Sequence, residues 1–208
     1  MLVVTIAGER LELTRLIGLG GAARRSFLAT LILVVLGLAV SVPWFGPGGR
    51  LAGAGLLCLA IWLARHDIAR RTIRNASLPR FMAACLLAGY AWLAVAGLMW
   101  LSFGGVVAGP RHDAMLHAVL VGFVISMVFA HAPVILPAVL GGSVPYRAWF
   151  YAPLVLLHVS LVLRIVGDLA AGPAAIRWGG LLSAAAIVLF GLSVAVARIE
   201  RREAPGLV

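Results

Sequence analysis

Six long apolar stretches, separated by short segments rich in glycine, proline and arginine, dominate this sequence. The stretches cover residues 26–43, 51–65, 81–108, 114–140, 147–168 and 178–197. A helix needs about 20 predominantly apolar residues to cross the hydrocarbon core of a bilayer, and most of these stretches approach that length. Hydrocarbon offers the backbone no hydrogen-bond partner, so each stretch must be helical. The sequence therefore predicts an all-α, polytopic transmembrane helix bundle of about six spans.

The charge of the chain supports a membrane location and argues against a nucleic-acid partner. Only 12% of the residues are charged, yet the formal net charge is +10, and every basic residue is an arginine. In a soluble protein such a charge would suggest nucleic-acid binding. Here the arginines lie between the apolar stretches, where they set the orientation of the helices in the membrane. We therefore expect the lipid bilayer, and no nucleic acid, as the partner of this surface.

The arginines also predict which side of the membrane each connection faces. One set of connections carries most of them: Arg10, Arg15, Arg24, Arg25, Arg65, Arg70, Arg71, Arg74, Arg80, Arg147, Arg198, Arg201 and Arg202. The other set carries only Arg50, Arg111, Arg164 and Arg177. Because basic residues concentrate on the cytoplasmic side, both termini are predicted to be cytoplasmic. We expect a multi-pass protein of a bacterial-type inner (plasma) membrane.

The chain divides into an N-terminal segment, residues 1–25, and a six-span membrane domain, residues 26–208. The apolar "LVVTIAG" covers only about 10 Å as a helix before the polar "ERLELTR" begins. We expect the segment to lie at the membrane interface, and it also has the character of a remnant of a truncated span. In the fourth span, a membrane tolerates Pro133 and Pro137 within a kinked helix. That helix is expected to end at Gly141–Gly142.

Two histidines are predicted to lie at matching depth near the centre of the bilayer. His131 is about 15 Å from the cytoplasmic end of the fourth span, and His158 is about 16 Å into the fifth. A buried imidazole must form a hydrogen bond or coordinate a metal, and ionisable groups at this depth are candidates for function. A shared metal or haem ligand is one interpretation. Interhelical hydrogen bonds are the other, to carbonyl groups or to Ser126, Tyr146, Tyr151 and Ser160.

A second polar level is predicted near the outer face. His117 precedes His131 by fourteen residues, which at 100° per residue places both rings on one helix face about 21 Å apart. His117 is therefore a candidate ligand at this level, with an interhelical hydrogen bond as the alternative. Arg164 and Asp168 should lie beside it as an i, i+4 ion pair, unless Arg164 binds a haem propionate.

The other two histidines are expected to have no ligand role. His112, which lies at the same boundary as Asp113, is expected to be a solvated loop residue. His66 lies within the arginine-rich "RHDIARR" and is expected at the membrane interface.

The stretches "MLHAVLVGFVISMVFAHAPVILPAVL" and "LVLLHVSLVLRIVGDL" resemble the NnrS family of polytopic membrane proteins. The likeness consists of Leu116–His117, Gly122 and Met127 on the fourth span and of "VLRI" around Arg164 on the fifth, and it covers about 60 residues. Members of that family contain haem and copper and are linked to nitric oxide metabolism. The resemblance implies the same cofactors and the same redox setting for this chain.

These observations together predict an integral membrane protein that binds haem b, copper or both in respiratory or nitric-oxide-related electron transport. His131 and His158 would be ligands at one level and His117 at another, with Arg164 on a propionate. Such a protein needs a redox partner, and a homodimer could complete a site. Two alternatives remain open: a small-molecule transporter or channel that uses the histidine face, and a structural or assembly subunit of a larger membrane complex.

Overall fold

Helices form the fold, as the sequence predicts. The computed structural model describes residues 2–15, 20–140 and 144–203, and every regular element in this part of the chain is helical. Six helices are long and apolar enough to cross a membrane: Gly21–Val40, Phe45–His66, Ser77–Phe103, Pro110–Val139, Ala148–Leu169 and Pro173–Glu200. The protein is a multi-pass membrane protein with an all-α fold.

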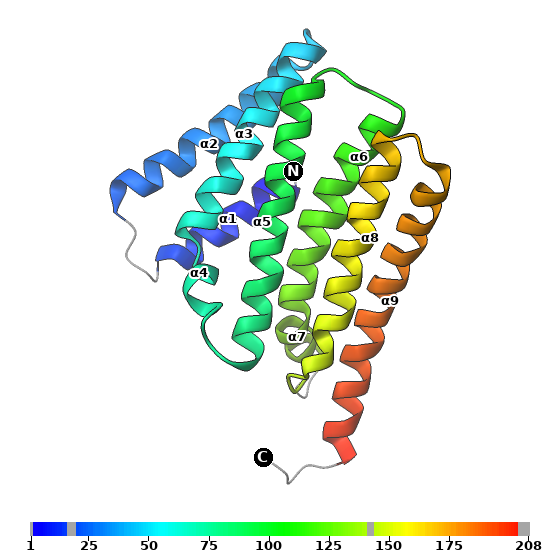
Figure 1. Cartoon of the computed structure of the whole chain (residues 1–208). Coiled ribbons are helices and arrows are strands. Elements are labelled where there is room, and N and C mark those ends of the chain that lie inside the picture. Colours follow the sequence, from blue (N-terminus) through cyan, green and yellow to red (C-terminus); the bar gives the residue numbers. More distant parts are fainter. Residues whose placement is uncertain (1, 16–19, 141–143, 204–208) are drawn as a thin grey trace.

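The spans stand side by side in an open row (Figure 1). Helix α2 (Gly21–Val40) pairs with α3 (Phe45–His66), which packs on α5 (Ser77–Phe103). The fourth span consists of α6 (Pro110–His117), the π-helix η1 (Ala118–Ile125) and α7 (Ser126–Leu140), and it packs on α5. Helix α8 (Tyr151–Leu169) follows a short 3-10 turn, η2 (Ala148–Phe150), and lies between α6 and α9 (Pro173–Glu203).

The two ends of the bundle, taken along the helix axes, differ in charge. One end, which we name the pocket end, holds the loop between α5 and α6 and the loop between α8 and α9 (top of Figure 1). The opposite end, which we name the arginine end, holds the arginine-rich segment around α4 (Ala69–Thr72), the start of α8 and the end of α9. This distribution follows the alternation of arginine-rich and arginine-poor connections along the sequence.

Glycines let neighbouring helices approach backbone to backbone. A Cβ atom at Gly37 of α2 would lie 2.2 Å from the backbone nitrogen of Ala52 in α3. A Cβ atom at Gly97 of α5 would lie 2.6 Å from the backbone nitrogen of Leu57. Lipid tails are as apolar as leucine, so close van der Waals contact of this kind is a main source of helix association in membranes.

The second span is longer than expected because its first turn includes residues assigned to a loop. The segment "FGPGGR" is helical from Phe45 onward. Pro47 lies in the first turn of α3. Backbone N–H groups in a first turn have no partner within the helix, so a proline, which lacks this group, does not disrupt the helix. The other end lies within one residue of the predicted one: α3 ends at His66, and Asp67 has an extended conformation before α4 begins.

The fourth span runs through both prolines, as predicted, but it is not a uniform α-helix. Pro133 and Pro137 lie inside α7, whose expected end at Gly141–Gly142 falls outside the described residues. Between His117 and Ser126 the helix is of the π type, with hydrogen bonds from residue i to i+5. The wider turns change the rotation per residue, so the 100° steps from which one shared face for His117 and His131 was predicted do not apply across this segment.

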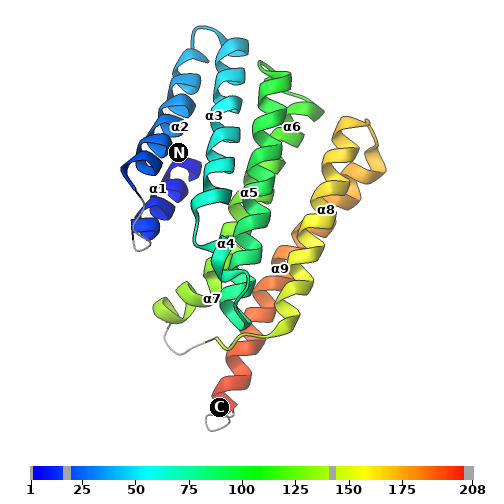
Figure 2. The same ribbon diagram turned by 60° about the vertical axis from the view of Figure 1, so that its left-hand side comes forward.

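Helix α7 also diverges from α8 toward the arginine end. Its last turns point away from the start of α8 (Figure 2), and it packs on α5, whereas α8 packs on α6 and α9. The N-terminal helix α1 (Leu2–Arg15) crosses the spans near the middle of the molecule and contacts α3. The expectation that residues 1–25 are interfacial remains a prediction, but Arg10 is buried, with 5% of its surface exposed.

Candidate metal-binding site

A polar pocket of about 320 Å³ opens at the pocket end, between the starts of α6 and α9 and the end of α8. Its walls combine two carboxylates, an imidazole and a guanidinium with the loop backbone: Gly109, Pro110, His112, Asp113, Arg164, Asp168 and Ile176. The fourth and fifth spans therefore meet here as predicted, with Arg164 and Asp168 at the level of the α6 histidines.

Arg164 connects three helices within this pocket. Its Nε donates to Asp168 Oδ2 at 3.1 Å, which confirms the predicted i, i+4 pair. Its Nη2 forms a close ion pair with Asp113 Oδ2 on α6, and its Nη1 donates to the Ile176 carbonyl of α9 at 3.4 Å. Gly179 permits the approach of α9, because a Cβ atom there would lie 2.6 Å from the Arg164 backbone nitrogen. Each of the three guanidinium nitrogens thus has one protein partner.

The charges of the pocket do not balance when His117 is neutral. Two carboxylates, Asp113 and Asp168, face one guanidinium, which leaves a net charge of −1. The Asp168 side chain is 2% exposed and that of Arg164 is 16% exposed, whereas that of Asp113 is 43% exposed, so solvent screens the charge on the Asp113 side only. A bound cation, or a proton on His117, would remove the imbalance.

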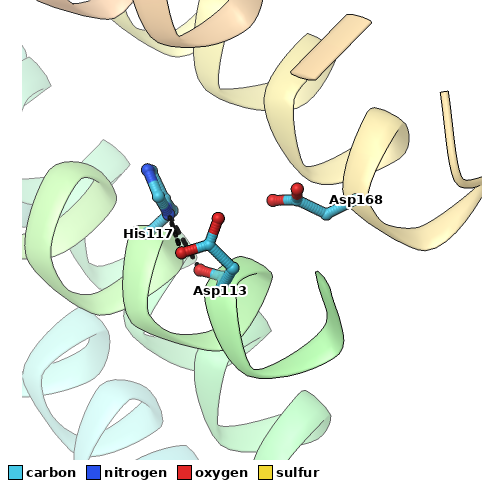
Figure 3. A group of neighbouring side chains, drawn as sticks. All are labelled: Asp113, His117 and Asp168. Carbon is cyan, nitrogen blue, oxygen red and sulfur yellow. Dashed lines mark hydrogen bonds and ion pairs between the residues drawn. The ribbon is translucent and has the colours of Figure 1, made fainter. Parts of the chain in front are cut away.

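The imidazole of His117 is held in the tautomer that a metal ligand needs. Its Nδ1 lies 2.8 Å from the backbone carbonyl oxygen of Asp113, one turn earlier in the helix. A carbonyl oxygen can only accept, so Nδ1 carries the hydrogen and Nε2 of the neutral ring keeps its lone pair. Metal-binding histidines are commonly oriented by such a bond from the second ring nitrogen. His117 could ligate through Nε2 only after its ring turns, because Nδ1 is the nitrogen that faces Asp113, 3.6 Å from its Oδ1 (Figure 3).

Asp113, His117 and Asp168 are close enough to form a metal centre after the group contracts. One potential ligand atom from each residue lies within 4.8 Å of the other two (Figure 3). In a four-coordinate site, bonds of about 2.0–2.2 Å to nitrogen or oxygen place the ligand atoms about 3.3–3.6 Å apart. The ligand atoms would therefore have to close by up to about 1 Å. Mixed imidazole and carboxylate donors suit zinc, copper and related transition metals.

His131, by contrast, is already bound to two groups. Its Nδ1 lies 2.6 Å from the Met127 carbonyl oxygen, so the ring carries its hydrogen there. Its Nε2 accepts a close hydrogen bond from Nη2 of Arg10 in α1. The lone pair that a metal would use is therefore directed at a guanidinium.

His158 has a different set of partners and the opposite tautomer. Trp92 Nε1 of α5 donates to His158 Nδ1 at 3.0 Å. Because Nδ1 accepts, a neutral ring carries its hydrogen on Nε2, which is buried and has no hydrogen-bond partner among the described residues. The serines considered as partners are engaged elsewhere: Ser126 Oγ donates to the Gly122 carbonyl, and Ser160 pairs with Ser183.

The structure thus gives His131 and His158 separate partners on separate helices and does not bring them together as a pair. A haem or metal shared by the two remains a prediction. As the side chains lie, they do not fit two-histidine ligation, because His131 would have to release Arg10 and His158 would have to give up the bond from Trp92.

Sequence reasoning missed three functional contacts. Asp113 was placed at the right boundary but not recognised as a partner of His117, although the i, i+4 spacing is a signal for it. Trp92 was left out of the predicted site, and no spacing rule links it to His158. Arg10 was assigned to the cytoplasmic surface, whereas it reaches His131.

A second buried polar contact lies toward the arginine end and was also missed. Tyr90 Oη donates to Asp67 Oδ2 at 2.8 Å, and the Ala69 backbone N–H donates to Asp67 Oδ1 at 2.7 Å. Asp67 and Tyr90 are both buried. The carboxylate thereby joins the break between α3 and α4 to α5.

Comparison with known proteins places the chain in a family without assigning it an activity. The family model described as "Domain of unknown function (DUF8744)" matches residues 1–199, and the chain belongs to this family. No curated protein and no solved structure matches the chain. The function must therefore be inferred from the chemistry of the side chains.

Proposed function

We propose that this member of the DUF8744 family is a membrane protein that binds a transition-metal ion in the pocket at the outer ends of its fourth and fifth spans. The ligands would be Asp113, Asp168 and His117, whose ring would turn so that Nε2 meets the ion. The observation that carries the proposal is the grouping of the His117 imidazole with two carboxylates that share a single arginine. A divalent ion would offset the excess negative charge.

Copper in a redox role is the more specific form of this proposal. An imidazole and two carboxylates accept Cu²⁺ as readily as Zn²⁺. The resemblance to the NnrS family adds copper, respiratory electron transport and nitric oxide metabolism. Arg164 would hold the carboxylates in place by its bonds to Asp113 and Asp168. Electron transfer would require a redox partner protein, or a second copy of the chain, at the pocket end.

The distribution of arginine supports an orientation for the proposed site. The arginine end would face the cytoplasm of a bacterial-type inner membrane, with both termini on that side. The pocket would then face outward, where it could exchange metal with the medium. A reporter enzyme that is active only outside the cytoplasm, fused to the C-terminus, should remain inactive, and an active fusion would reverse the orientation.

Haem b at His131 and His158 is a separate proposal with its own test. It requires both rings to exchange the partners that they have now. Purified protein should then show a Soret absorption band that His131→Ala or His158→Ala removes. A colourless preparation that still binds copper would reject haem and retain the metal site.

Titration of purified, metal-free protein with Cu²⁺ tests the proposed site directly. We expect one equivalent to bind, with a loss of at least about tenfold in affinity for His117→Ala and for Asp168→Asn. His66→Ala is a matched control, because the Nδ1 of that ring also donates to a helix carbonyl, that of Trp62, at 3.0 Å, but at the arginine end. If the wild type and these three variants bind Cu²⁺ with equal affinity, the copper lies at another site.

The transporter alternative, which uses the histidine face, gains no support from the prolines, because α7 continues through Pro133 and Pro137 without a break that could form a binding site. The structural-subunit alternative predicts that no metal binds at the pocket, so the same titration decides it.

A further inference from the structure

We propose that His112 is a fourth ligand of the same metal ion, so that the centre contains two imidazoles and two carboxylates. The inference rests on the proposed function, because it assumes that Asp113, His117 and Asp168 bind a metal. It departs from the expectation that His112 is only a solvated loop residue. It also defines the class of ion that the pocket selects.

His112 belongs to the wall of the pocket. It lines the cavity together with Asp113, Arg164 and Asp168, and it is partly buried. It lies in the first turn of α6, directly before Asp113 and five residues before His117. The same helix thus presents one imidazole and one carboxylate to the cavity, and His117, which does not line it, lies one turn beyond Asp113.

The ring of His112 is fixed in the same tautomer as that of His117. Its Nδ1 lies 3.1 Å from the carbonyl oxygen of Val106, so Nδ1 carries the hydrogen and Nε2 of the neutral ring has a lone pair. Val106 belongs to the loop between Gly104 and Gly109, both of which have positive φ values, 61° and 86°. The loop therefore folds back so that its backbone holds the imidazole in the wall of the metal-free pocket.

Binding requires a local movement of His112. The three residues whose ligand atoms lie within 4.8 Å of one another are Asp113, His117 and Asp168, and His112 stands in the wall beside them. Its ring would turn into the cavity about its side-chain bonds when the ion binds, and its Nδ1 would give up the carbonyl of Val106. The cavity of about 320 Å³ leaves room for this rotation.

A fourth ligand of this kind narrows the choice of ion. Two nitrogen and two oxygen donors complete a four-coordinate site of the type that Zn²⁺ and Cu²⁺ accept. Ca²⁺ and Mg²⁺ prefer six or more oxygen ligands, which this pocket does not offer with its side chains alone. The site should therefore bind Cu²⁺ or Zn²⁺ in the presence of a large excess of Ca²⁺ or Mg²⁺.

Pulsed electron paramagnetic resonance of the Cu²⁺-loaded full-length protein counts the imidazole rings on the ion. We expect two rings in the wild type and one in both His112→Ala and His112→Gln, with a loss of at least about tenfold in Cu²⁺ affinity. The glutamine variant keeps a polar side chain in case alanine disturbs the turn. The control His66→Ala should keep two rings and the wild-type affinity.

The outcomes separate this inference from the proposed function. One ring in the wild type, unchanged in both His112 variants, would overturn the role of His112 and leave the three-residue site intact. Absence of bound Cu²⁺ in the wild type, or a signal that survives His117→Ala, would overturn both.

Discussion

The buried ion pair between Arg164 and Asp168 makes the sharpest prediction about stability. Asp168 has 2% of its side chain exposed, and its carboxylate receives a bond from Arg164 Nε. Arg164→Met keeps much of the side-chain volume but leaves that carboxylate buried without its counter-charge. Removal of one partner from a buried pair typically costs about 3–5 kcal/mol of the free energy of unfolding.

The second carboxylate bound to Arg164 gives an internal comparison. The Asp113 side chain is 43% exposed, so solvent can replace its ion pair. Asp113→Asn should therefore cost no more than about 1 kcal/mol, the range measured for exposed pairs. A double variant, Arg164→Met with Asp168→Leu, removes both buried charges and should recover most of the loss from Arg164→Met alone.

Equilibrium unfolding of the metal-free protein in mixed micelles, followed by circular dichroism, measures these differences. The reasoning is refuted if Arg164→Met costs as little as Asp113→Asn. It is equally refuted if the double variant is less stable than Arg164→Met, because the charge on Asp168 would then not be the source of the loss.

Three further substitutions test contacts at other levels of the bundle. Trp92→Phe removes the donor to His158 and should cost about 1–3 kcal/mol of unfolding free energy, and a loss below 0.5 kcal/mol, well under that range, would show that the bond is absent. Gly97→Ala places a Cβ atom 2.6 Å from a neighbouring backbone and should cost about 1–3 kcal/mol, whereas Gly191→Ala, with nothing within 4 Å, should have no effect on the same assay. Tyr90→Phe leaves a buried carboxylate without one of its two donors and should lower the thermal unfolding midpoint, and an unchanged midpoint would contradict the described bond.

The spans could be predicted from the sequence because every segment that crosses hydrocarbon must be apolar and helical. Apolar length and arginine-rich connections follow from that requirement alone. The pair of Arg164 with Asp168 was also predictable, since both residues lie on one helix four positions apart. The level of His117 beside them followed from counting residues back from the tight connection between the fourth and fifth spans.

The partners of the mid-membrane histidines could not be predicted, because depth does not determine direction. The count placed His131 and His158 at one height. In the structure a π-helix precedes Ser126 and α7 diverges from α8, and neither feature follows from a residue count. The two rings have different partners. A π-helix depends on hydrogen bonds that tertiary packing selects, and hydrophobic periodicity carries no signal for it. The tautomers, which decide whether a ring can bind a metal, depend on single carbonyl or indole contacts.

The most direct test of the central claim is an anomalous difference map from crystals of the protein loaded with Cu²⁺ or Zn²⁺. We predict a peak in the pocket at about 2.0–2.2 Å from oxygens of Asp113 and Asp168 and from Nε2 of His117. A fully loaded protein whose peak lies beside His131 or His158, with none between Asp113 and Asp168, would contradict the account.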